Sequence, residues 1–194
     1  MSTRGMIGLR VNGKFLGTYN HSDSYPDGLG ADLTDFVRNL AKNGQTQTFK
    51  ANAAKVKMVN SQSKPSEKVY AYYHGLTGGS MLGAERERKE FYSLLRGYQG
   101  VAGLDAILSG QLKHITKDPE FIKDSLFCEY AYILDLDREV LEYYEGFTKV
   151  KPSPDYEFGT ECGGQGYYAC RKVGEVPFAK ATTKAMLKLF PKLD

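Results

Sequence analysis

The Asn12-Gly13 dipeptide is the feature of this sequence that most limits its fold. It separates two runs of strand-forming residues, 6–11 and 15–19. Asparagine and glycine tolerate the left-handed backbone conformations of a two-residue turn, so this dipeptide is a strong signal for a β-hairpin. We therefore predict an antiparallel strand pair near the start of the chain.

A second hairpin is predicted around the acidic turn Asp135-Leu136-Asp137-Arg138. Residues 127–134 alternate as a strand with two different faces does, and residues 140–144 form the matching run after the turn. Hairpins grouped apart from helices predict an α+β fold, with mainly antiparallel sheets layered with helices. The 194 residues contain no clear linker, so we expect a single domain, 1–194.

Apolar periodicity predicts the remaining elements. Leu29, Leu33, Phe36, Val37 and Leu40 recur at helical spacing, and we expect this helix to pack on the first hairpin. Further helices are expected at 84–98, 104–112, 119–125 (capped by Asp118) and 179–190, further strands at 56–59, 68–73 and 167–176, and loops at 20–30 and 149–166. The last helix is expected to face inward with Ala181, Ala185, Leu187 and Leu189.

The charge balance narrows the class of partner. The chain has 26 Lys plus Arg against 23 Asp plus Glu, a net charge of +3, which favours neither duplex nucleic acid nor a membrane surface as partner. No apolar run approaches the roughly 20 residues that span a bilayer, and residues 1–5 do not resemble a secretory signal. We therefore expect a cytoplasmic protein with no membrane partner.

The sequence indicates no metal and no cofactor. Cys128 lies in an apolar run and is expected to be buried, while Cys162 and Cys170 are eight positions apart, without zinc-site spacing. The glycine-rich residues 75–80 precede a predicted helix, but no Gly-Lys-Ser or Gly-Lys-Thr follows and the GxGxxG pattern is absent. These residues are expected to form a flexible loop, with a weak anion cradle as the alternative.

The densest polar cluster is the heptapeptide Tyr19-Asn20-His21-Ser22-Asp23-Ser24-Tyr25, where the second strand leaves the sheet. In an extended segment His21 and Asp23 would point to the same side and form an acid–base pair. The alternative is an ordinary turn in which Asp23 and Ser24 bond the backbone. As a ligand site, the cluster offers Asn20, His21, Asp23 and Ser24 for hydrogen bonds.

Aromatic and basic side chains extend this ligand hypothesis. Tyr19 and Tyr25 flank the polar loop and are candidates for stacking on a ring, with Arg4 or Arg10 available for an anionic group. Most other tyrosines, including Tyr70, Tyr72, Tyr73, Tyr167 and Tyr168, are expected to pack within strands.

Ser2 suggests a different chemistry. If Met1 is removed, Ser2 presents a hydroxyl and an α-amine together, and such an amine can activate its own side chain as a nucleophile. In most proteins that begin Met-Ser, Ser2 has no such role.

Residues 2–23 loosely resemble the opening of the choloylglycine-hydrolase-like N-terminal nucleophile hydrolases. The resemblance rests on Ser2-Thr3-Arg4-Gly5, the Asn12-Gly13-Lys14 turn and Tyr19-Asn20-His21-Ser22-Asp23, and the turn around Asp135-Leu136-Asp137 is also similar. The family implies a layered αββα fold and a terminal nucleophile, although it has Cys in place of Ser2 and Arg in place of Tyr19. The chain also resembles uncharacterised bacterial and phage proteins with Thr-Arg-Gly and a later Asp-Ser-Tyr-Pro-x-Gly-Leu-Gly.

Two classes of function follow from these patterns. The first is a small-molecule-binding protein that sequesters an anionic, nucleotide-like signalling ligand near Arg4, Tyr19, Asn20, His21, Asp23, Ser24 and Tyr25. The second is an amide or ester hydrolase, either with Ser2 as nucleophile and Asn20 and Asp23 positioning the amine and oxyanion, or with His21 and Asp23 as the acid–base pair. A tyrosine-rich surface also leaves a protein partner or a homo-oligomer open.

Overall fold

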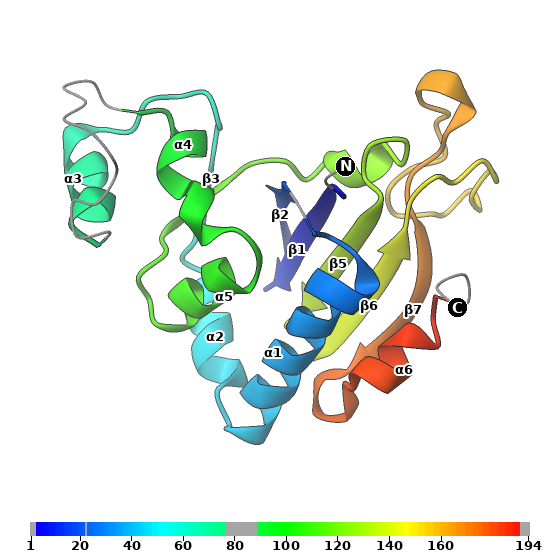
Figure 1. The fold of residues 1–194 in the computed structure, drawn as a ribbon, viewed down its shortest axis with the longest axis horizontal. Coiled ribbons are helices and arrows are strands. Elements are labelled where there is room, and N and C mark those ends of the chain that lie inside the picture. Colours follow the sequence, from blue (N-terminus) through cyan, green and yellow to red (C-terminus); the bar gives the residue numbers. More distant parts are fainter. Residues whose placement is uncertain (1–2, 22, 77–88, 191–194) are drawn as a thin grey trace.

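A five-stranded sheet forms the centre of the protein in the computed structural model, which describes residues 3–21, 23–76 and 89–190 (Figure 1). The strands, in spatial order, are β2 (Lys14–Asn20), β1 (Gly5–Val11), β5 (Tyr130–Asp135), β6 (Val140–Glu145) and β7 (Arg171–Pro177). All neighbours pair antiparallel except β1 and β5, which are parallel. The predicted α+β class with mainly antiparallel pairing is confirmed.

Both predicted hairpins are present. In the first, Asn12 and Gly13 have φ values of 51° and 71°, the left-handed conformations that this two-residue turn requires. In the second, the Asp135 carboxylate accepts the backbone amides of Asp137 and Arg138 at 3.0 and 2.9 Å, which closes the turn between β5 and β6.

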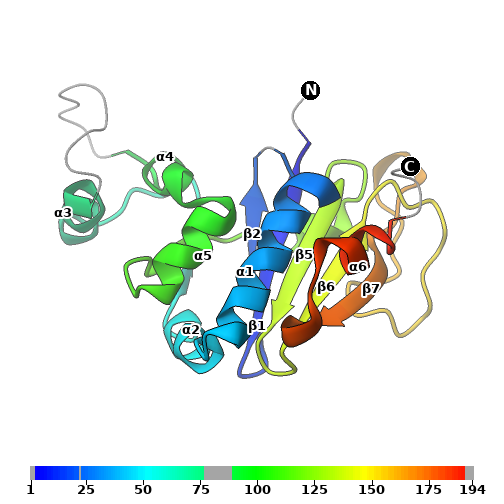
Figure 2. The same ribbon diagram turned by 60° about the horizontal axis from the view of Figure 1, so that its bottom comes forward.

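Helices cover one face of the sheet (Figure 2). The buried side of α1 (Ala31–Lys42) is formed by Leu33, Thr34, Phe36, Val37 and Leu40. The Thr34 hydroxyl lies 2.9 Å from the hydroxyl of Tyr143 in β6, so α1 covers the middle of the sheet and not the first hairpin alone. The short α6 (Thr183–Leu187) packs beside α1.

Loops cover the opposite face. Met6, Ile133 and Tyr144 point to this side, where they pack against Phe158 and the 3-10 turn Phe121–Lys123. The αββα arrangement would place a second stacked sheet here, and the described residues form none. The expected loop at 149–166 is therefore part of a core, although only the 3-10 turn Gly164–Gly166 is regular.

A second lobe lies beside β2, at the left of Figure 1. Its elements are α2 (Thr46–Ala53), β3 (Lys57–Val59), α3 (Glu67–Leu76), α4 (Phe91–Leu95), the 3-10 turn Arg96–Tyr98, α5 (Gly100–Leu108) and β4 (His114–Thr116). β3 and β4 form a separate two-stranded parallel sheet. Hydrophobic residues of both lobes belong to one continuous core cluster.

Two elements of this lobe differ from the sequence-based expectation. Residues 68–73 form part of helix α3 and not a strand, because only Tyr73 of its residues is fully buried and the apparent alternation of tyrosines has no buried face to match. Tyr70 instead stacks on His74 one helical turn later, with ring centroids 5.9 Å apart. Helix α2 was not predicted at all; its Phe49 packs on Phe36 of α1.

Several element boundaries also need correction. The helix expected at 84–98 begins at Phe91 within the described residues, and residues 84–88 lie outside them. The last strand begins at Arg171, so Tyr167 and Tyr168 precede it, and only Phe121–Lys123 of the segment 119–125 is helical, without a cap from Asp118.

The C-terminal helix is also shorter than expected. Only Thr183–Leu187 is helical, and Met186 is its buried residue. Ala181 before the helix and Phe190 after it are also buried, whereas Leu187 is exposed. The inward direction predicted for Leu187 is therefore wrong.

Candidate functional site

The predicted polar loop begins where β2 ends, at Asn20, and leads through the single π-helical turn Pro26–Gly30 into α1. Asn20 and Ser24 are buried and bonded to each other, with the Asn20 amide donating to the Ser24 hydroxyl at 2.8 Å. The Ser24 amide donates to the carbonyl of Thr3, and the Ser24 carbonyl accepts the hydroxyl of Tyr132 at 2.9 Å. Both residues therefore fix the loop against β1 and β5, which limits their part in ligand binding.

The backbone at Asp23 is not extended. Its φ is +56°, in the left-handed region, and its carbonyl accepts the amide of Leu29 at 3.2 Å. Only an extended chain would place His21 and Asp23 on the same side by alternation, and the chain is not extended at Asp23. Their pairing as acid and base stays a prediction, and the turn alternative describes this backbone better.

An open groove lies beside this loop. Its volume is about 370 Å³, and its polar lining comes from Asn20, His21 and Asp23 in the loop, Asp32 at the start of α1, and Arg96 and Gln99 before α5. The Gln99 side chain accepts the backbone amide of His21 at 3.1 Å, which ties the loop to the second lobe. Three residues predicted for a site, Asn20, His21 and Asp23, thus meet three that were not predicted, Asp32, Arg96 and Gln99.

The charges of the groove are mixed. Asp23 and Asp32 are exposed carboxylates and Arg96 is an exposed guanidinium, so the lining suits a ligand that offers hydrogen-bond donors as well as an anionic group. Burial raises the pKa of the nearby Tyr19 hydroxyl, while the positive charges of Arg4 and Arg96 act in the opposite direction. Tyr19 therefore lies within the field of two guanidinium groups.

The aromatic candidates are separated from each other. The Tyr19 ring packs on Phe121 and lies 6.1 Å from the ring of His21. Tyr25 is 42% exposed and lies beside Tyr130, with ring centroids 6.3 Å apart. Tyr25 does not line the groove that the described residues form, so the structure does not bring the two tyrosines together on one ligand ring.

The two arginines suggested for an anion differ in the contacts that their side chains already make within the protein. Arg4 lies over the ring of Phe127, 4.8 Å from its centroid, and its side chain does not line the groove described above. Arg10 forms ion pairs with Asp135, Glu142 and Glu157 at 4.0, 3.4 and 2.7 Å. The suggestion of Arg10 for a ligand anion is therefore wrong.

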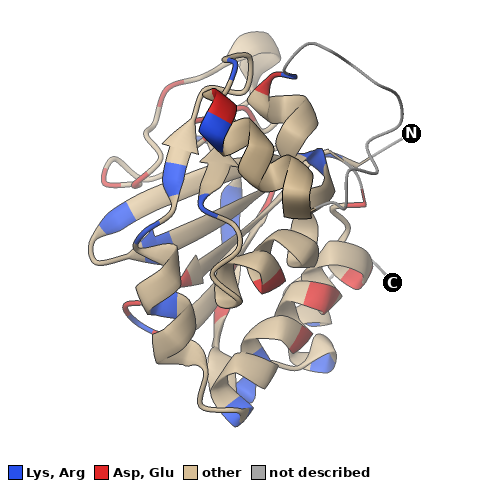
Figure 3. Ribbon diagram, turned by 90° about the vertical axis from the view of Figure 1, so that its left-hand side faces the viewer, with Lys and Arg blue, Asp and Glu red and all other residues tan. Residues whose placement is uncertain are grey.

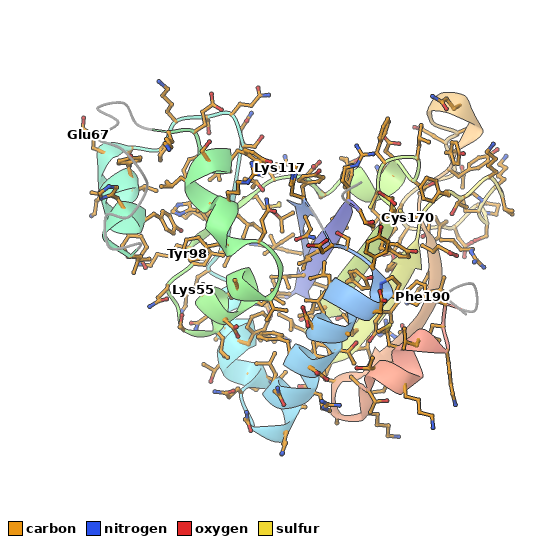
Figure 4. All side chains as sticks on the ribbon, viewed as in Figure 1. Lys55, Glu67, Tyr98, Lys117, Cys170 and Phe190 are labelled. Carbon is orange, nitrogen blue, oxygen red and sulfur yellow. The ribbon has the colours of Figure 1, made fainter. Side chains whose placement is uncertain are left out.

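A smaller cavity adjoins the groove and shares Gln99 and Gly100 with it. Tyr19, Tyr92 and Tyr98 line it on the aromatic side; Tyr98 is labelled in Figure 4. Its volume of about 40 Å³ holds water molecules but not an aromatic ring.

Five residues that line the groove or the cavity are not predicted from the sequence: Asp32, Tyr92, Arg96, Tyr98 and Gln99. Arg96 and Tyr98 were assigned to a long helix, whereas the chain turns here, and Gly100 has a left-handed φ of +63°. The spacing of Gly97 and Gly100 was the available sign of that turn.

Ser2 lies outside the described residues, so its role as a nucleophile stays a prediction. Cys128 and Cys170 are buried free thiols and Cys162 is exposed. Within the described ranges, no three His, Cys, Asp or Glu side chains are grouped as metal ligands, and no helix is long and apolar enough to cross a membrane.

Comparison with known proteins gives no match for this chain: no protein-family model, no curated protein and no solved structure resembles it significantly.

Proposed function

We propose that the protein binds a small anionic, nucleotide-like ligand in the groove between the polar loop and α5. The observation that carries this proposal is the meeting of Arg96 with Asp23 and Asp32 around a hollow of about 370 Å³. A guanidinium is the preferred partner of a phosphate, and carboxylates accept hydrogen bonds from ribose hydroxyls. A nucleotide carries both kinds of group, whereas a simple polyanion would be repelled by the two carboxylates.

Binding without turnover is the form of function that the groove supports best. Asn20 and Ser24 are committed to the fold, and the extended geometry expected for His21 with Asp23 does not hold. The protein would then hold a signalling nucleotide and release it unchanged, in the cytoplasm.

The first experiment is mass spectrometry of the purified protein under native and denaturing conditions, followed by calorimetric titration with AMP and GMP. We expect Arg96→Ala to weaken nucleotide binding by about tenfold or more, because it removes a charge-assisted contact. Arg171→Ala is the matched control, since Arg171 pairs with Glu145 at the opposite edge of the sheet and lies outside the groove. Saturable binding that Arg96→Ala leaves unchanged would reject the groove as the site.

The denaturing mass also tests the hydrolase hypothesis. A chain that retains Met1 excludes Ser2 as a terminal nucleophile, and a chain that lacks it justifies assays of amide and ester hydrolysis.

A further inference from the structure

A pocket whose charged lining residues are all lysines lies in the second lobe, away from the groove. Its volume is about 360 Å³, and its lining includes Lys55, Lys57, Lys113, His114 and the side-chain amide of Asn52. The lining contains no Asp or Glu, and it shares no residue with the groove. Figure 3 views the molecule from the side of this lobe, with lysine and arginine in blue, and Figure 4 labels Lys55 beside α5.

The local fold explains why these cations gather. Val56 is buried between Lys55 and Lys57, so the two lysines flank an inward-pointing residue. Lys57 pairs with His114 in the parallel β3–β4 register, and the Lys57 amide donates to the carbonyl of Lys113 at 3.0 Å. The β3–β4 pairing thereby brings Lys55, Lys57 and Lys113 together at the start of one small sheet.

These ammonium groups are not neutralised within the described part of the chain. None of its ion pairs or hydrogen bonds uses the Nζ atoms of Lys55, Lys57 or Lys113, although Lys113 Nζ lies 4.5 Å from the centroid of the Tyr72 ring. Other lysines of the protein do have carboxylate partners, such as Lys50 with Asp137 and Lys172 with Glu142. A hollow lined by unpaired charges of one sign attracts ions of the other sign.

His114 contributes a neutral donor. The Tyr73 hydroxyl accepts the backbone amide of Lys113 at 3.0 Å and lies 3.0 Å from Nδ1 of His114, which fixes the orientation of the ring. A neutral imidazole has one ring N–H, which can donate a hydrogen bond. Burial, with the charges of Lys57 and Lys113, lowers the pKa of His114, which keeps the ring neutral beside the lysines.

We propose that this pocket, formed by Lys55, Lys57, Lys113, His114 and Asn52, binds the phosphate group of a small phosphomonoester. A phosphate dianion balances several ammonium groups at once, and the amide of Asn52 and the imidazole add uncharged donors. Asn52 already donates to the carbonyl of Leu108 at 3.0 Å, so its amide is held in place. A bounded hollow with an apolar wall from Leu112 fits a small ester better than the continuous basic track that a nucleic-acid strand needs.

A structural role for the lysines is the competing explanation. Helices α2 and α5 end beside the pocket, and cations stabilise the carbonyl ends of helices. In that case the lysines would raise the melting temperature in phosphate-free buffer but would bind no phosphate.

The test is calorimetric titration with ribose 5-phosphate, with ribose as the uncharged probe. We expect ribose 5-phosphate to bind and ribose not to bind, and Lys55→Gln, Lys57→Gln and Lys113→Gln each to weaken binding by about tenfold or more. Lys184→Gln on α6 is the matched control, because Lys184 is exposed and lies outside the pocket. The melting temperature in phosphate-free buffer identifies any variant that fails to fold. Because three lysines are changed one at a time, the other two variants still test the proposal if one of them does not fold.

Three outcomes would overturn this inference. The first is no binding of ribose 5-phosphate at millimolar concentration, or equal binding by all variants. The second is loss of binding in Arg96→Ala but not in the lysine variants, which would place the phosphate in the groove and support the proposed function alone. The third is binding of a short single-stranded RNA about a hundredfold tighter than ribose 5-phosphate with a steep salt dependence, which would indicate a nucleic-acid surface.

Discussion

The Asp137 carboxylate accepts the backbone amide of Gly13 at 2.9 Å, although the two residues are 124 positions apart in the sequence. Its other oxygen accepts the amide of Asn12 at 2.9 Å and pairs with Lys50 of α2 at 2.8 Å. The turn of the second hairpin therefore holds the turn of the first, and α2 is attached to both. The signal for the Asn12-Gly13 turn is local in the sequence, but in the folded protein the turn is also held by the tertiary contact with Asp137.

This contact predicts a pH dependence of stability. The Gly13 amide, the Lys50 ammonium and the Asn12 amide lower the pKa of Asp137 to about 2 from the ordinary 3.8 of an aspartate. Because the folded pKa is the lower one, the carboxylate stabilises the fold above about pH 4, and this contribution is lost as pH falls towards 2. Asp137→Asn should lower the melting temperature at pH 7. Circular dichroism melts from pH 7 to pH 2 should show this difference shrinking, and a difference constant over that range would contradict the assignment.

Gly5 is a position where even a methyl group does not fit. A Cβ atom there would lie 2.5 Å from the carbonyl oxygen of Tyr130 and 2.7 Å from the Ser24 side chain. Gly5→Ala should therefore destabilise the protein by about 1–3 kcal/mol in urea denaturation. Gly75→Ala is the matched control in α3, where no atom of the described residues lies within 4 Å, and it should be neutral or stabilising by up to about 1 kcal/mol. Equal changes in the free energy of unfolding for the two variants would show that the loop containing Ser24 can move to make room for the methyl group at position 5.

The buried Glu142 carboxylate is the centre of a charge network on the loop-covered face. It pairs with Arg10, Arg138 and Lys172 at 3.4, 3.3 and 2.6 Å and accepts the Tyr144 hydroxyl at 3.0 Å. Glu142→Gln removes the charge that balances these cations in a side chain only 3% exposed. Because each of the three cations keeps another carboxylate partner, we expect a loss of about 1–3 kcal/mol in the free energy of unfolding, measured by urea denaturation.

The control for this change is Glu120→Gln. Glu120 pairs with Lys123 at 2.6 Å, but its side chain is 72% exposed, so solvent screens the pair. The expected loss is below about 1 kcal/mol. A Glu142→Gln variant as stable as Glu120→Gln would mean that the buried network adds nothing to stability.

The two hairpins were predictable because their signals are local. Asn12 and Gly13 adopt the left-handed conformations that their own chemistry favours, and Asp135 closes its turn with its own side chain. Helix α3 was not predictable in the same way. Its Tyr73 is buried by the tertiary contact with His114, which lies 41 positions later, and the local pattern of tyrosines favoured a strand instead.

The site shows the same division. The position of the polar loop at the end of β2 follows from the sequence, since strand ends carry loops. Its partners do not follow, because Gln99 reaches His21 across 78 positions only once α5 packs on α1 and α2. The lysine pocket likewise combines residues 55–57 with 113–114, which only the β3–β4 pairing brings together.

Tyr143 and Thr34 join the sheet to the helix that carries Asp32. The Thr34 hydroxyl donates to the carbonyl of Gly30 at 2.7 Å, so it accepts the Tyr143 hydroxyl at 2.9 Å. Burial raises the pKa of Tyr143 to about 12, so the phenol keeps its proton at neutral pH. Tyr143→Phe should cost about 1 kcal/mol, and Thr34→Val more, because it leaves the buried phenol without an acceptor. In urea denaturation the double variant should lose less than the sum of the two single losses; strict additivity would show that the two hydroxyls are not coupled.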